Sequence, residues 1–416
     1  MSKSDEPQVA ADAAEERRRR AEERLVAASK IRWTPRELSE RMAAQVVGQQ
    51  EALRTISVAA IQHLTARVRR IASTMPPVQP TRIAPILCIG GPGTGKTLTC
   101  RVLGQQLGLT HHIADAGRLT AEGWQGLGLS EVLHPLLTQA GHNMDYARCG
   151  VVCLDEIDKL RRSDMLAHGG RDISGGDAQN LLMKLLNGDV VQFEVFGGPG
   201  GTGRTMITFP TDHLLVMAAG AFQGLESVVM DRLRGRKRLG FGENGDRRLD
   251  ELSPSELRRM VTREDLQVYG LKREICSRFG RIIVFDDLDR RALRRILVET
   301  PEGPFATVQA LATAQGFRFD DFPPALVEAI LDRCGGDARR LSGLVSQATE
   351  AAFYSVPDRI RAMGRRATHG EVVVGLRSDS LDNGYHTVRM EQPAGVTEEE
   401  EVILPQPRRA RTARGG

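Results

Sequence analysis

Short apolar runs, separated by segments of helical length, dominate the first two thirds of the chain. The runs that have the length and composition of buried strands are 86–89, 110–114, 150–154, 213–219 and 281–285. After the first run, apolar residues recur at helical spacing from Leu98 to Leu107, and Gly108 is a suitable helix stop. Strands that alternate with helices predict an α/β domain with a mainly parallel sheet over residues 36–285.

The apolar pattern becomes helical after the last of these runs. One apolar stripe covers 292–297 and a second covers 325–331. Asp337 can cap a third helix, and a short strand is expected at 371–376. The pattern predicts a smaller, mostly helical domain over residues 286–376.

Both ends of the chain are polar. Residues 1–35 are a charged N-terminal extension with almost no apolar face, although Glu16 stands four positions before Arg20 and an ion pair there would support a solvated helix. From 377 to 416, an acidic run precedes an arginine-rich end. This composition predicts a disordered tail.

Composition narrows the class of protein. The chain has 416 residues, 41% hydrophobic and 26% charged, which is typical of a soluble globular protein of two or three domains. A formal net charge of +4 is too small over this length to indicate nucleic-acid binding. No apolar stretch is long enough to span a membrane, and the polar N-terminus has no signal-peptide core. The six cysteines form no C-x-x-C pair, so we expect reduced core thiols in a cytoplasmic protein, with Cys149 and Cys153 packing rather than binding metal.

A phosphate loop of the Walker A type lies between the first predicted strand and the helix that follows it. Its residues, which match G-x-x-x-x-G-K-[ST], are Gly90, Gly91, Pro92, Gly93, Thr94, Gly95, Lys96 and Thr97. The glycines allow backbone N–H groups to turn toward phosphate oxygens, and the helix N-terminus adds partial positive charge. Lys96 can reach the β- and γ-phosphates of ATP, and the Thr97 hydroxyl can bind Mg²⁺.

An apolar strand that ends in two acids follows at residues 151–156 and has the Walker B pattern. Asp155 would hold Mg²⁺, directly or through water, and Glu156 would polarise the attacking water. A glutamate directly after the aspartate favours a hydrolase over a kinase.

A second glycine run, from Gly198 to Thr205, resembles a phosphate loop in outline. It has Arg204 where the lysine should be, and no apolar helix follows it. We interpret it as a flexible loop rather than a second nucleotide site.

Together these motifs resemble the ClpX-type unfoldases of the AAA+ superfamily, over roughly residues 34–376. Val46 to Gln49 resembles the V-x-G-Q box that lines the family's adenine pocket, and Asp155 to Lys159 matches its extended Walker B motif. The resemblance implies an AAA+ P-loop large domain with a parallel sheet, followed by a smaller helical lid domain. The nucleotide-binding residues that it implies are Val47, Gly48, Gly91, Pro92, Gly93, Thr94, Gly95, Lys96, Thr97, Leu98, Asp155 and Arg339. The family's N-terminal four-cysteine zinc domain has no match in this sequence, so its choice of substrates and adaptors is not carried over.

The resemblance also implies catalytic residues beyond Glu156. Arg278 aligns with the arginine finger that contacts the γ-phosphate of a neighbouring subunit, and the nearby Arg281 is the alternative. Arg339 aligns with the sensor-2 arginine, which contacts nucleotide from the small domain and couples hydrolysis to domain rotation.

Two loops are expected to contact other proteins. The residues that fall where the family carries its polypeptide-gripping pore loop are Gly123, Trp124, Gln125 and Gly126, with Trp where ClpX has Tyr and Gln in place of an aliphatic residue. The residues that resemble the tripeptide by which ClpX docks on the ClpP peptidase are Leu239, Gly240 and Phe241.

The sequence therefore predicts an ATP-driven protein unfoldase that forms a homo-hexameric ring. The ring would thread unfolded or tagged proteins through its pore and deliver them to a ClpP-like peptidase. One alternative is a remodelling chaperone without a peptidase. Another is a nucleic-acid motor on the same core, which the small net charge disfavours. A third is a scaffold that has lost catalytic activity. The intact Lys96, Asp155, Glu156, Arg278 and Arg339 argue against it.

Overall fold

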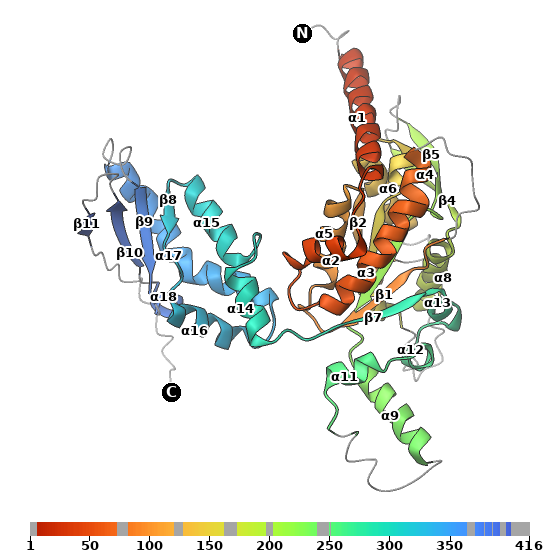
Figure 1. Ribbon diagram of the computed structural model, residues 1–416. Coiled ribbons are helices and arrows are strands. Elements are labelled where there is room, and N and C mark those ends of the chain that lie inside the picture. The colour runs from red at the N-terminus through yellow and green to blue at the C-terminus, as the bar shows by residue number, and fades with distance from the viewer. Residues whose placement is uncertain are drawn as a thin grey trace, which may run out of the picture. The chain divides into compact units, whose positions relative to one another are not determined.

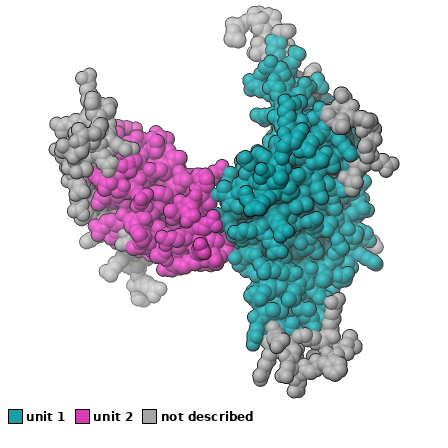
Figure 2. Space-filling model, viewed as in Figure 1, with its two compact units in different colours: residues 1–287 teal, residues 288–416 magenta. Residues whose placement is uncertain are grey.

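The chain folds as two compact units, residues 1–287 and residues 288–416 (Figure 2). The computed structural model describes residues 6–72, 82–119, 128–161, 173–196, 203–238, 249, 251–363, 371–377, 379–384, 386–391 and 397–400. Over these residues, no helix has the length and apolar character needed to cross a membrane. The boundary between the units lies two residues beyond the predicted end of the large domain at 285.

Unit 1 is built on a five-stranded parallel sheet with the order β2-β3-β6-β1-β7 (Figure 1). The strands are β1 (Ile86–Gly90), β2 (His111–Asp115), β3 (Val151–Asp155), β6 (Leu215–Gly220) and β7 (Arg281–Phe285). Each overlaps one of the predicted apolar runs. Strands β1 and β6 are buried along their whole length, which explains why they read as continuous apolar runs rather than alternating ones. The prediction of an α/β domain with a parallel sheet is confirmed.

Helices cover this sheet and extend from it. The helices and helical turns of unit 1 are α1 (Glu6–Ser29), α2 (Pro35–Ala43), α3 (Gln50–His63), the π-helical turn η1 (Leu64–Val68), α4 (Arg69–Ala72), α5 (Lys96–Leu107), η2 (Ala116–Arg118), α6 (Leu129–Gln139), α7 (Met144–Ala147), η3 (Ile157–Leu160), α8 (Ile173–Asn187), α9 (Leu225–Arg238), α11 (Pro254–Arg259), α12 (Arg263–Tyr269) and α13 (Arg273–Arg278). Helix α5 packs against β1, β3 and β6 and ends at Gly108, which has a φ of 61°. The predicted stop at Gly108 is therefore confirmed. The helix begins at Lys96, within the phosphate loop.

A two-stranded antiparallel hairpin, which the sequence analysis did not predict, interrupts the alternation. It consists of β4 (Val190–Phe196) and β5 (Arg204–Pro210). Arg204 and Thr205 are the first residues of β5 and pair with Phe196 and Val195, so they do not belong to a loop as predicted. The glycines between the strands lie outside the described residues. A strand after the glycine run cannot supply the helix N-terminus of a phosphate loop, which agrees with the interpretation of this run as no second nucleotide site.

Helix α1 is part of unit 1 and not only a solvated extension. Ala21, Leu25 and Ala28 are 3%, 6% and 3% exposed and belong to the same buried cluster as the sheet. Their spacing of four and three residues places them on one face of the helix. The predicted ion pair between Glu16 and Arg20 is present at 2.8 Å. The prediction of almost no apolar face is wrong, because three small or medium apolar residues are enough to dock one end of the helix.

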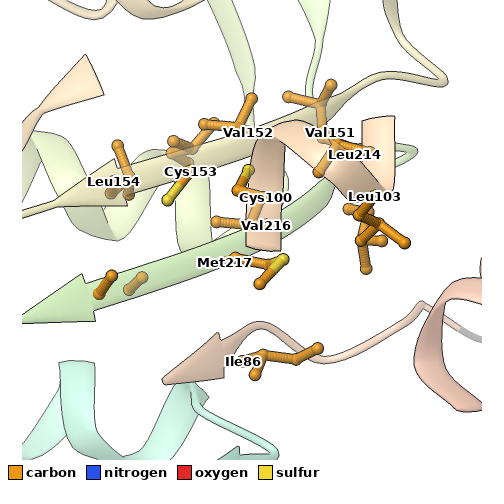
Figure 3. Packing of buried hydrophobic residues seen from close by; sticks show 14 of the residues in the cluster. Ile86, Cys100, Leu103, Val151, Val152, Cys153, Leu154, Leu214, Val216 and Met217 are labelled. Atoms are coloured by element: carbon orange, nitrogen blue, oxygen red, sulfur yellow. The ribbon is translucent and has the colours of Figure 1, made fainter. Parts of the chain in front are cut away.

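The centre of the core lies between α5 and the strands β3 and β6 (Figure 3). Cys100 of α5 and Cys153 of β3 are neighbours in this region. A hydrogen bond with Cys153, together with burial, raises the pKa of the Cys100 thiol well above its usual value. All six cysteines are free and buried, in agreement with their prediction as reduced core thiols.

Unit 2 combines helices with a four-stranded sheet of order β11-β10-β9-β8. Its elements are α14 (Arg290–Val298), α15 (Pro304–Ala314), β8 (Phe317–Phe319), α16 (Pro324–Cys334), α17 (Arg339–Met363), β9 (Glu371–Leu376), α18 (Ser380–Asn383), β10 (His386–Glu391) and β11 (Thr397–Glu400). The three predicted helices correspond to α14, α16 and α17, and the strand at 371–376 is confirmed. As predicted, Asp337 caps α17, since its Oδ1 accepts a hydrogen bond of 2.9 Å from the backbone N of Arg339.

The predicted disordered tail is wrong for part of the chain after residue 377. Strand β10 pairs with all six residues of β9, and β11 pairs with β10. His386, the first residue of β10, is 4% exposed and lies within hydrogen-bond distance of Ser355 in α17 at 2.9 Å. Residues in 380–391 therefore belong to the fold of unit 2.

The docking of α1 can be tested by cavity formation at its buried face. Leu25→Ala should lower the free energy of unfolding of unit 1 by about 2–3 kcal/mol, because it removes a buried side chain from a packed core. Val26→Ala, one position along and 41% exposed, should cost less than about 1 kcal/mol. Urea denaturation of both variants measures the difference. Equal midpoints for the two variants would show that α1 is not docked.

Candidate nucleotide site

The phosphate loop connects β1 to α5 through a tight backbone path. Gly93 and Gly95 have φ values of 75° and 93°, in the left-handed region that favours glycine. A Cβ atom on Gly90 would lie 2.6 Å from the carbonyl oxygen of Phe285. One on Gly91 would lie 2.9 Å from Oδ1 of Asp287. Glycine is therefore favoured at 93 and 95 by the left-handed backbone and at 90 by the close approach of the carbonyl oxygen that ends β7.

Lys96 lies inside this loop and is 7% exposed. Its Nζ donates hydrogen bonds to the carbonyl oxygens of Gly90 and Gly91, at 2.8 and 2.7 Å. The backbone of the phosphate loop thus holds the ammonium group at the place where a bound phosphate would lie. Phosphate oxygens would compete with these two carbonyls for the same donor, since an ammonium ion prefers a charged acceptor.

Thr97 and Asp155 bring the two Walker motifs together. The Thr97 hydroxyl donates a hydrogen bond of 2.5 Å to Oδ2 of Asp155. Asp155 ends β3, and β6 lies between β3 and β1, so contact across the sheet is made by the first turn of α5. A hydroxyl and a carboxylate at this separation are oxygen donors of the kind that Mg²⁺ prefers.

Glu156 follows Asp155 in the left-handed conformation, with a φ of 58°. This turn directs its side chain away from the line of β3, and it forms an ion pair with Lys159 one turn later. The hydrogen bond to Glu156 raises the pKa of Lys159. Glu156 is half-exposed and lies directly beside a candidate metal ligand.

The V-x-G-Q box packs against the same loop. Val47 is 5% exposed, and the side chain of Val46 lies 3.5 Å from where a Cβ on Gly95 would be. Gly48 has a φ of 81°, which turns the chain so that Gln49 points into the protein. Leu98, in the first turn of α5, is half-buried and packs against the core.

The sequence analysis placed Gln49 in the V-x-G-Q box but did not predict its contacts. Gln49 is 2% exposed, and its Nε2 donates hydrogen bonds to the carbonyl oxygens of Thr94 and Asp286, at 3.1 and 2.8 Å. Its Oε1 accepts one from the backbone N of Asp286 at 2.9 Å. Its place in the V-x-G-Q box was a signal, but its partners are backbone groups that no sequence pattern identifies.

Arg278 and Arg281 lie near the amino ends of the strands, opposite the carboxyl ends that carry the phosphate loop. Arg278 ends α13, and Arg281 begins β7, where it pairs in register with Ile86 at the start of β1. Both side chains are exposed and have no hydrogen-bond or ion-pair partner among the described residues. Gly90 stands four strand residues further along, about 13 Å away. A pocket of about 600 Å³ opens beside Arg281, lined also by Ile86 and Gly280.

The remaining predicted residues are not brought to this site within unit 1. Arg339 is the first residue of α17 in unit 2. The predicted pore-loop residues Gly123 to Gly126 and the tripeptide Leu239 to Phe241 lie outside the described residues.

Comparison with known proteins agrees with this site. The family model of the AAA proteins, "ATPase family associated with various cellular activities", matches residues 86–241, from the start of β1. The chain is 31% identical over 330 residues to the ATP-dependent Clp protease ATP-binding subunit ClpX of Treponema denticola, covering 78% of this chain and 77% of the relative. It is 30% identical over 326 residues to ClpX of Porphyromonas gingivalis, covering 78% of each chain. It is 30% identical over 341 residues to ClpX of Azotobacter vinelandii, covering 80% of this chain and 76% of the relative.

The chain belongs to the ClpX family of AAA+ proteins. Membership confirms the resemblance based on the Walker motifs and makes the chain an ATPase that binds nucleotide. The geometry fits a nucleotide in this ClpX-type chain, because a glycine-lined loop, a buried lysine and a paired hydroxyl and carboxylate converge at the end of β1.

A hydroxyl deletion on α5 tests the candidate Mg²⁺ ligand. Thr97→Val keeps the side-chain shape and should remove most of the Mg²⁺-dependent gain in ATP affinity, about tenfold or more, because one of two oxygen donors is lost. Thr99→Val is the matched control, since its hydroxyl donates within the helix to Gly95 at 2.8 Å. Titration of a fluorescent ATP analogue with and without Mg²⁺ measures the effect. The same Mg²⁺ dependence in both variants would exclude Thr97 as a ligand.

Proposed function

We propose that this ClpX-family chain is the motor subunit of a hexameric ring that unfolds proteins and threads them through a central pore to a ClpP-like peptidase. The observation that carries the proposal is the joining of the Walker A and Walker B motifs by the hydrogen bond between Thr97 and Asp155. It supports ATP turnover by a chain whose relatives are named as ATP-binding subunits of an ATP-dependent protease. That printed name favours delivery to a peptidase over a chaperone that acts alone.

The side chains of the site have distinct tasks in ATP hydrolysis. Lys96 would leave the carbonyls of Gly90 and Gly91 and bind phosphate oxygens. Thr97 and Asp155 would hold Mg²⁺, which neutralises charge on the phosphates when it is bound. Glu156 would accept a proton from the attacking water, while its Oε2 is paired with Lys159.

An arginine supplied by a neighbouring subunit fits the position of Arg278 and Arg281. The parallel register of β1 and β7 keeps the start of β7 about 13 Å from the phosphate loop of the same chain. Two exposed arginines without partners among the described residues are available to a ligand outside the chain. This supports a closed ring in which each site is completed by the next subunit.

Contacts with substrate and peptidase are proposed from the sequence. Trp124, flanked by glycines, would press against the translocating chain without selecting particular side chains. Leu239 to Phe241 would anchor apolar side chains in pockets of the peptidase ring, and repetition around the ring would add avidity.

Mixing of two inactive variants tests the shared active site. Glu156→Gln alone should bind ATP and turn it over at least about a hundredfold more slowly, because the base is lost. Arg278→Ala alone should be similarly slow if Arg278 is the finger. Mixed rings should regain measurable ATPase activity, because an intact Glu156 on one chain then meets an intact Arg278 from its neighbour.

Arg281→Ala is the control in the same mixing experiment. If it is nearly as active as the unmodified chain, Arg278 is the finger. If Arg281→Ala is inactive and is complemented while Arg278→Ala is active, the roles are reversed. The absence of recovery in both mixtures would contradict a finger supplied in trans.

A pore-loop variant tests protein threading. Trp124→Ala should keep ATPase activity within about threefold and lose at least about tenfold of its rate of unfolding a tagged fluorescent protein, because the contact area on the polypeptide is removed. Trp33→Ala, a change to the other of the two tryptophans, is the control. Unimpaired unfolding by the Trp124 variant would remove this residue from the pore.

A further inference from the structure

The last residues of unit 1 are held against the phosphate loop. Phe285 and Asp287 approach so closely that side chains at Gly90 and Gly91 would collide with them, at 2.6 and 2.9 Å. Asp287 is the final residue before unit 2 begins. The connection between the units therefore starts in direct contact with the loop that would bind phosphate.

Gln49 links the phosphate loop to the end of unit 1 by hydrogen bonds. Its amide spans from Thr94 in the loop to both backbone groups of Asp286, with one hydrogen bond to the first and two to the second. A neutral amide is needed, because the side chain donates to carbonyl oxygens and accepts from an N–H at once. At 2% exposure, water cannot replace these hydrogen bonds, so a change in either segment is felt by the other.

Two arginines fix the side chains of the same connection. Arg258, whose side chain is 12% exposed, pairs with Asp287 at 3.0 Å and with Glu226 at 2.6 Å. Arg259 pairs with Asp286 at 2.7 Å. Because these arginines belong to α11, both carboxylates of the connection are tied to unit 1.

We propose that Gln49 is a positioning residue that couples nucleotide binding in the phosphate loop to the orientation of the connection to unit 2. The coupling rests on the proposed nucleotide site. Phosphates compete with the carbonyls of Gly90 and Gly91 for Lys96, so nucleotide binding releases those carbonyls and rearranges the loop. Gln49 transmits that rearrangement from Thr94 to the peptide groups of Asp286, one residue before the boundary.

A distance measurement between the units in the full chain tests this coupling. Spin labels on Val268→Cys in unit 1 and Tyr354→Cys in unit 2 use side chains that are 74% and 86% exposed, and the six native cysteines are buried. Glu156→Gln is included to prevent hydrolysis, and labelled chain is diluted into unlabelled chain. We expect ATP, at a concentration that saturates each variant, to shift the inter-unit distance distribution of the unmodified protein, and Gln49→Met to abolish that shift.

Gln309→Met is the matched control. Gln309 of unit 2 clamps the backbone N and O of Phe319 at 2.9 and 3.3 Å, as Gln49 clamps Asp286, but away from the loop and the connection. It should keep the ATP-induced shift. A normal shift in Gln49→Met, or no shift in the unmodified protein despite ATP binding, would overturn the coupling. No ATP binding at all would overturn the proposed site as well.

Gln49→Glu distinguishes coupling through hydrogen-bond donation from a purely structural role of residue 49. Its carboxylate can accept from Asp286 N but would repel the two carbonyls, and burial raises the pKa of such a group. Protonation restores one donor, so the ATP-induced shift should be absent at about pH 8 and partly recover at about pH 5.5. A normal shift at both pH values, or no recovery at the lower one, would show that donation by residue 49 does not carry the coupling.

Discussion

The parallel pairing of β1 with both β6 and β7 is the constraint on which the nucleotide site depends. All of β1 is buried, and its residues are in register with 217–220 on one side and 281–285 on the other. This fixes where the chain leaves the sheet at Gly90. Everything that follows, from the left-handed glycines to the inward-facing Lys96, is built from that point. Because β6 separates β1 from β3, the two Walker motifs meet only through the first turn of α5.

The same register places two groups of candidate residues at opposite ends of the strands. The carboxyl ends of the strands supply the phosphate loop, Asp155 and the connection after Phe285. The amino end of β7 carries Arg281, and the end of the preceding helix carries Arg278. In the proposed ring, the arginines of one chain would complete the nucleotide site of the neighbouring subunit.

The sequence predicted the parts of the fold that depend on continuous burial. Strands such as β1 and β6 have no polar positions, and α14, α16 and α17 have clear apolar stripes. It missed β4 and β5, because only one face of the hairpin is buried and its strands are not continuous apolar runs: Val191, Phe193 and Val195 belong to the core, whereas Val190 and Met206 are 60% and 57% exposed. It missed β10 for the same reason, because the strand reads as polar and is defined by pairing with β9. In the site, the Walker residues were predictable from motif chemistry, whereas Gln49 acts through backbone groups of residues 45 and 237 positions away.

Helix α1 has a mechanical consequence. Its buried residues Ala21, Leu25 and Ala28 pack into unit 1, and the helix extends away from the sheet toward its N-terminal end (Figure 1). A helix of 24 residues is about 36 Å long. It is therefore a rigid extension that is attached to unit 1 by its buried residues, rather than a flexible linker. A protein held at its N-terminal end would therefore keep a nearly fixed orientation relative to unit 1. Its approach to the surface of unit 1 would be restricted to a small range of directions.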